Sequence, residues 1–151
     1  MCATLSLEEI VQAAIKEEEK SVAAYHFVLE KVIQPAARHL FEEIIQDELG
    51  QIEGLRNLTL SHKESEFEKG TEEQKILRFL SGKEIMEIHS LQDALLFSIK
   101  KEQAAIEAYG ALSRLTEDPR AKKLFEILAE EELSHKRKVE ALYNKLVYQE
   151  N

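Results

Sequence analysis

Six polar residues fall where the apolar stripes of four predicted helices would continue. Apolar residues recur at three- and four-residue spacing along these helices, which predicts one buried face on each. Near the middle of every helix the stripe is interrupted, by Glu18, Glu48, Gln51, Glu102, Glu132 and His135. Burying one unpaired carboxylate costs several kcal/mol, so four buried anions need compensation. Two divalent cations would supply four positive charges, and the sequence therefore predicts a metal site.

The spacing of the pair in the last predicted helix suits metal binding. Glu132 and His135 are three residues apart, which places both on one face of a helix. The corresponding pair earlier in the chain is Glu48 and Gln51. A glutamine offers a neutral carbonyl oxygen, but it is a poorer ligand than imidazole for iron or zinc. One of the two metal positions is therefore expected to be weaker than the other, or empty.

The two pairs correspond because the sequence repeats itself at an offset of 84 residues. Tyr25 then aligns with Tyr109, and Pro35 with Pro119, without gaps. Each repeat reads as two antiparallel helices joined by a short loop. The predicted helices cover residues 7–33, 35–58, 91–115 and 119–147, with N-terminal capping signals at Ser6, Ser90 and Asp118.

These elements predict an all-α, antiparallel four-helix bundle made of two duplicated hairpins. Residues 1–151 are read as a single domain, with repeat 1 at 6–58, a crossover at 59–90 and repeat 2 at 91–147. The crossover is expected to contain a short helix over residues 72–80, started near Thr71 and closed by Gly82.

The composition of the chain argues against several classes of function. The 151 residues carry a formal net charge of −9, which argues against binding of nucleic acid. No apolar stretch reaches the length of a membrane span, and no signal peptide is visible at the N-terminus. Cys2 is the sole cysteine and is given no role. We therefore expect a cytoplasmic protein without disulfides.

On these residues the chain resembles the rubrerythrin branch of the ferritin-like (di-iron carboxylate) superfamily. The resemblance rests on Glu102-x-x-Ala105-x-x-x-Tyr109 and Leu124-Phe125-x-x-Leu128-Ala129-Glu130-Glu131-Glu132-x-x-His135, echoed by Glu18, Tyr25, Phe41 and Glu48. It implies a ferritin-like fold with two metal ions, iron first and manganese or zinc as alternatives. The implied ligands are Glu18, Glu48, Glu102, Glu132 and His135, with Gln51 as a weak ligand. Glu48 and Glu132 would bridge the ions, and Tyr25 and Tyr109 would donate hydrogen bonds to carboxylates.

The implied function is oxidation of ferrous iron, or reduction of peroxide or oxygen with electrons from an external donor protein. The chain lacks the cysteine pairs of a rubredoxin domain, and Ala105 stands where rubrerythrins often carry an extra carboxylate. Homo-oligomers are common in such bundles. The alternative is a non-catalytic metal-binding or structural bundle with a degenerate site, holding one metal or none, because Gln51 replaces the expected histidine.

Structural or surface roles are the alternative interpretation for several residues. The tyrosines could serve packing alone, and rotation of the helices could turn the glutamates partly toward solvent. Four histidines are expected at the surface, namely His26, His39, His62 and His89. Four glutamates beside the predicted ligands are expected on solvated faces, namely Glu17, Glu19, Glu130 and Glu131.

Overall fold

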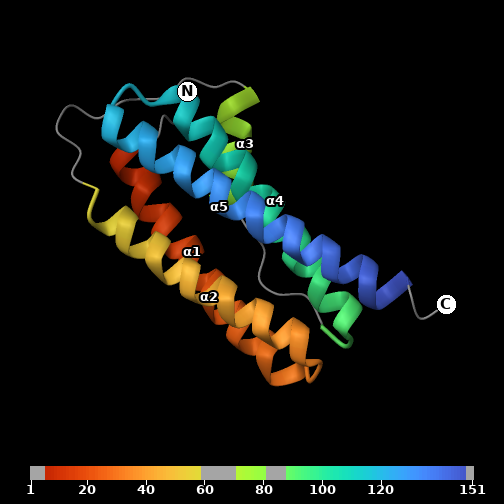
Figure 1. The fold of residues 1–151 in the computed structure, drawn as a ribbon. Coiled ribbons are helices and arrows are strands. Elements are labelled where there is room, and N and C mark those ends of the chain that lie inside the picture. Colours follow the sequence, from red (N-terminus) through yellow and green to blue (C-terminus); the bar gives the residue numbers. More distant parts are fainter. Residues whose placement is uncertain (1–5, 59–70, 81–87, 149–151) are drawn as a thin grey trace.

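The computed structural model describes residues 6–58, 71–80 and 88–148, and every regular element in them is a helix (Figure 1). The helices are α1 (Leu7–Lys31), α2 (Pro35–Arg56), α3 (Thr71–Leu80), α4 (Leu91–Leu115) and α5 (Pro119–Tyr143), followed by a π-helical turn, Asn144–Tyr148. The predicted all-α bundle is confirmed. Gly82 and His62 lie outside the described residues, as does Cys2.

Two helical hairpins lie side by side and form the bundle. The first hairpin is α1–α2 and the second is α4–α5, each closed by a short connection, and α2 packs against α5 (Figure 1). The short helix α3 belongs to the crossover and packs on α4 and α1. No helix of the described segments is both long and apolar enough to cross a membrane.

Helix α1 ends two residues before the predicted end. Val32 is extended (ψ 124°), and Gln34 caps α2 directly before Pro35. A residue that precedes proline is pushed out of the helical region. Arg38 supports the turn, because its guanidinium donates hydrogen bonds to the carbonyl oxygens of Leu29 and Val32, the latter at 2.8 Å. Two carbonyls at the end of α1 thereby gain hydrogen-bond donors.

The N-terminal caps of three helices agree with the sequence signals. Ser6 and Glu9 form a reciprocal capping box at α1. At α4 only half of that motif forms: the Ser90 hydroxyl accepts from the backbone N–H of Asp93 at 3.0 Å, while the Asp93 carboxylate accepts from the N–H of His89. Asp118 caps α5 through the N–H groups of residues 120 and 121.

Ser90→Ala should lower the free energy of unfolding by about 1 kcal/mol, because an N-cap hydroxyl is lost at an exposed position. Urea unfolding followed by circular dichroism measures the loss. Ser90→Thr is the matched control, since it keeps the hydroxyl and should retain most of the stability. Equal losses in the two variants would show that the hydroxyl bond contributes nothing.

The apolar core is divided into two clusters, separated by a polar layer. The first cluster joins the N-terminal half of α1 to the C-terminal halves of α2 and α4, the N-terminal half of α5, and α3. The second joins the opposite halves of the four long helices. The duplication is visible in both, because Tyr109 packs on Phe125 in the first and Tyr25 on Phe41 in the second (ring centroids 6.2 and 5.7 Å apart). The polar layer lies at the middle of the bundle.

Candidate metal centre

The polar layer consists of the residues that interrupt the apolar stripes. All six are buried, with at most 2% of each residue exposed: Glu18, Glu48, Gln51, Glu102, Glu132 and His135. They come from α1, α2, α4 and α5, and each lies between the residues that its helix contributes to the two apolar clusters. The alternative in which helix rotation turns the glutamates toward solvent is therefore wrong.

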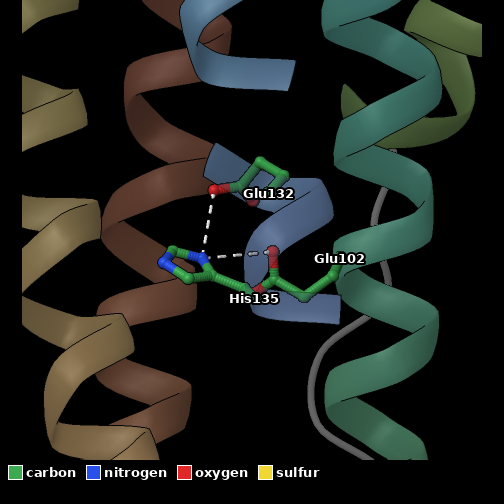
Figure 2. A group of neighbouring side chains, drawn as sticks. All are labelled: Glu102, Glu132 and His135. Carbon is green, nitrogen blue, oxygen red and sulfur yellow. Dashed lines mark ion pairs between the residues drawn. The ribbon is translucent and has the colours of Figure 1, made fainter. Parts of the chain in front are cut away.

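Two groups of potential ligand atoms form within this layer. Glu102, Glu132 and His135 make up one group, and Glu18, Glu48 and Glu132 the other; the ligand atoms of each group lie within 4.8 Å of one another. In the first group, Nδ1 of His135 faces Oε2 of Glu102 at 3.7 Å and Oε1 of Glu132 at 3.6 Å (Figure 2). Glu132 belongs to both groups, whereas Glu48 belongs to one of them. The bridging roles remain predictions.

Three of the four glutamates are held through one oxygen and leave the other free. Tyr109 donates to Oε1 of Glu18 at 2.9 Å, and Tyr25 donates to Oε1 of Glu102 at 2.9 Å. The hydroxyl of Ser21 donates to Oε1 of Glu48 at 2.8 Å. In all three carboxylates Oε2 is buried and has no hydrogen-bond partner. Both tyrosine hydroxyls thus orient carboxylates in addition to packing.

The imidazole of His135 is fixed in the same manner. Its Nε2 lies 2.7 Å from Oδ2 of Asp47, whose side chain is 46% exposed, while Nδ1 is buried without a hydrogen-bond partner. A carboxylate on the far ring nitrogen is the usual way to set the tautomer and orientation of a metal-binding histidine. Asp47 was not among the predicted site residues.

The corresponding pair of the first repeat has the same arrangement. Nε2 of Gln51 donates to Oε2 of Glu131 at 2.9 Å and to Oε1 of Glu132 at 2.6 Å. The 84-residue offset relates Glu131 to Asp47, and His135 to Gln51. An acidic residue directly before Glu48 and before Glu132 was the signal that could have identified both acids.

The expected surface residues divide into confirmed and wrong predictions. His26, His39 and His89 are exposed, as are Glu19 and Glu130. Glu131 is half-buried and bonded to Gln51 rather than solvated. The prediction for Glu17 is wrong as well: it is 5% exposed, and Lys20 pairs with its carboxylate at 3.1 Å.

The electrostatics of the metal-free layer disfavour charge on most of its carboxylates. Burial, followed by the charge of Glu132, raises the pKa of Glu18 from 4.5 to about 8. Burial likewise raises the pKa values of Glu48 and Glu102 well above the usual range, with further contributions from neighbouring carboxylates. These three carboxyls hold protons more tightly than free glutamate does.

For His135 and Glu132, in contrast, the pKa shifts favour the charged forms. Burial would lower the pKa of His135, but the facing carboxylates of Glu102 and Glu132 raise it from 6.5 to about 11. Burial would raise the pKa of Glu132, but the facing imidazole lowers it below 4.5. His135 and Glu132 therefore form an ion pair at the centre of the metal-free layer.

A divalent metal fits these residues. Five buried atoms of the layer have no hydrogen-bond partner, namely Oε2 of Glu18, Glu48 and Glu102, Oε1 of Gln51 and Nδ1 of His135. Buried polar atoms are normally hydrogen-bonded, and a cation that displaces the protons of this layer would give these atoms a partner. Carboxylate oxygens with one imidazole nitrogen suit iron, manganese or zinc.

Comparison with known proteins agrees with this geometry. The model of the Rubrerythrin family matches residues 93–151, which include Glu102, Glu132 and His135. No curated protein and no solved structure gives a match. The family match and the carboxylate–histidine cluster fit a di-iron carboxylate protein. The part of the chain that carries α4 and α5 is therefore similar to the rubrerythrins.

Proposed function

We propose that the chain is a dimetal carboxylate oxidoreductase that binds iron and oxidises ferrous iron, or reduces peroxide or oxygen with electrons from an external donor. The observation that carries this proposal is the buried polar layer, in which two groups of potential ligand atoms share Glu132 and five polar atoms have no hydrogen-bond partner. In a core that serves packing alone, buried carboxyl and amide oxygens would normally have hydrogen-bond partners.

The two ions would be held by different sets of helices, which have α5 in common. Glu102, Glu132 and His135 would hold one, and Glu18, Glu48 and Glu132 the other, with Gln51 beside the second. Bound iron would supply one-electron chemistry, since two ferrous ions becoming ferric provide the two electrons that, with two protons, reduce one peroxide to two waters. The protein side chains would fix the ligands before the reaction, because hydroxyls of Tyr25 and Tyr109 already hold one oxygen of a carboxylate each.

The chain also offers a proton connection to the surface. His135 is buried, but its Nε2 contacts the half-exposed carboxylate of Asp47. Binding of a cation would release the protons held at Glu18, Glu48 and Glu102, and Asp47 gives them an acceptor at the edge of the layer. In this proposal the electrons come from an external donor protein.

Anaerobic loading with ferrous iron tests the proposal. We expect more than one iron per chain at saturation, and rapid loss of ferrous iron, measured with a ferrous-specific chelator, when peroxide or oxygen is added. Glu126→Gln changes an exposed glutamate of α5 and should leave both results unchanged. Fewer than one iron per chain, or oxidation no faster than in buffer, would contradict the proposal.

The runner-up function is a structural or binding bundle with a degenerate site, and Gln51 is the residue that favours it. The double variant Glu102→Leu, Glu132→Leu separates the two. Under the oxidoreductase proposal this variant loses iron binding and peroxide-dependent oxidation. A variant that is more stable than the metal-free wild type and loses no measurable activity would instead support the structural function.

A further inference from the structure

We propose that the two cation positions have different ligand atoms and therefore different metal preferences, with Glu131 as the positioning residue of the weaker one. In this proposal Glu18, Glu48, Glu132 and the carbonyl oxygen of Gln51 form an oxygen-only position for a hard, exchangeable divalent cation. The position containing His135 holds a borderline transition-metal ion more tightly. The inference rests on the proposed function only in that the layer binds divalent cations.

The orientation of the Gln51 amide follows from its neighbours. Its nitrogen lies within hydrogen-bond distance of two carboxylates, Glu131 at 2.9 Å and Glu132 at 2.6 Å. Ionised carboxylates accept hydrogen bonds and donate none, so the NH₂ group must face them. The carbonyl oxygen Oε1 is left buried and without a partner, in a residue that is 2% exposed. The amide is thus held with its acceptor free for a cation.

The internal repeat contains a second arrangement in which an acidic residue orients a candidate ligand. Asp47 of α2 holds the far nitrogen of His135 of α5, and Glu131 of α5 holds the far nitrogen of Gln51 of α2. In both cases the remaining atom, Nδ1 of His135 or Oε1 of Gln51, is buried and unpaired. Gln51 therefore keeps the supporting acid that a ligand at this position needs, while the ligand atom has changed from nitrogen to oxygen.

A second difference between the repeats acts on the glutamates. Ser21 donates to Glu48 at 2.8 Å, whereas the residue at the equivalent position of the second repeat is Ala105, which cannot donate. One oxygen of Glu48 is therefore committed to a hydroxyl, and Glu132 is the carboxylate that belongs to both groups. The oxygen-only position consequently depends on Glu132, which it shares with the histidine position.

Ligand chemistry decides which ions the two positions prefer. Imidazole favours zinc, iron and cobalt, whereas carboxylate and carbonyl oxygens suit manganese and magnesium. Exchange of an imidazole for an amide oxygen should therefore lower affinity for Co²⁺ more than affinity for Mn²⁺. Loss of a residue that orients a ligand typically costs ten- to a hundredfold in metal affinity, so removal of the Glu131 carboxylate should weaken the oxygen-only position by about tenfold.

Titrations of the metal-free protein with Co²⁺ and with Mn²⁺ test the inference, followed by calorimetry and, for Co²⁺, by visible absorption. In the wild type we expect one Co²⁺ to bind about tenfold or more tightly than the second, with a smaller ratio for Mn²⁺. Gln51→His should raise the affinity for the second Co²⁺ by about tenfold and the affinity for Mn²⁺ much less. Glu131→Gln should weaken the second ion alone, and Asp47→Asn should weaken the first.

Glu130→Gln is the matched control, because Glu130 is the exposed neighbour of Glu131 and should change neither step. Two Co²⁺ ions that bind the wild type with equal affinity would overturn the inequality and leave the proposed dimetal function intact. Equal effects of Glu131→Gln on both steps would overturn the positioning role. Absence of any Co²⁺ or Mn²⁺ binding would overturn the proposed function itself, together with this inference.

Discussion

Glu132→Gln should abolish binding of both ions, because Glu132 is the one residue common to the two groups of ligand atoms. A neutral amide removes the shared anionic ligand while keeping the volume of the side chain. In the wild type, ligand present at a hundred times its dissociation constant stabilises the folded state by about 2.7 kcal/mol. We expect this metal-dependent rise in thermal stability to disappear in the variant, as measured by melting with and without Fe²⁺ or Co²⁺.

Two further variants make this result specific. Glu18→Gln should remove only one ion, because Glu18 belongs to one group, and Glu126→Gln should remove none. Metal content per chain after equilibrium dialysis distinguishes two, one and zero ions lost. A Glu132→Gln variant that folds with wild-type helical content and keeps one ion at full affinity would show that Glu132 is not shared.

The metal-free protein should be most stable near pH 4.5 and should lose stability as the pH rises toward 8. The pKa of Glu18 is raised from 4.5 to about 8, so its stabilising contribution is complete below 4.5 and is lost through 8. Glu48 and Glu102 act in the same direction. His135 loses its contribution between 6.5 and about 11. Since one pKa unit corresponds to about 1.4 kcal/mol, the combined loss by pH 8 should reach several kcal/mol.

At the acid end the sign reverses. The pKa of Glu132 is lowered below 4.5, so its contribution is lost as the pH falls through the folded-state pKa. Urea unfolding in the presence of a chelator, at pH 4 to 8, measures the whole profile. Glu18→Gln should flatten the slope between pH 4.5 and 8, because the group that gains charge is gone. A metal-free stability that is constant or increasing between pH 6 and 8 would contradict the assignment.

Metal should invert this dependence. Cations bind the deprotonated carboxylates and the unprotonated imidazole nitrogen, so their affinity rises with pH as protons are displaced. The protein with saturating metal should therefore gain thermal stability from pH 5 to 7.5, over the range in which the metal-free protein loses it.

The fold and the position of the polar layer could be predicted because they depend on local patterns. Caps and apolar spacing set the helices, and the 84-residue repeat set their pairing. The end of α1 at Lys31 was missed, because the contact of Arg38 with the carbonyls of Leu29 and Val32 forms only after the hairpin closes.

The burial of the six polar residues could also be predicted, because a polar residue on an apolar stripe is visible in one helix alone. The residues that orient them could not be found by that rule. Asp47, Ser21 and Glu131 lie beside the stripe, and they reach their partners only through the packing of one helix against another. The burial of Glu17, which pairs with Lys20 three residues further along α1, was also not predicted.

The division of the ligands between the hairpins has a consequence for assembly. Glu102, Glu132 and His135 all belong to the second hairpin, so an ion held by them fastens α4 to α5. An ion held by Glu18, Glu48 and Glu132 would instead connect α1 and α2 of the first hairpin to α5 of the second. The weaker, oxygen-only position is thus the one that closes the bundle, and an exchanging cation there would tighten or loosen the contact between the repeats.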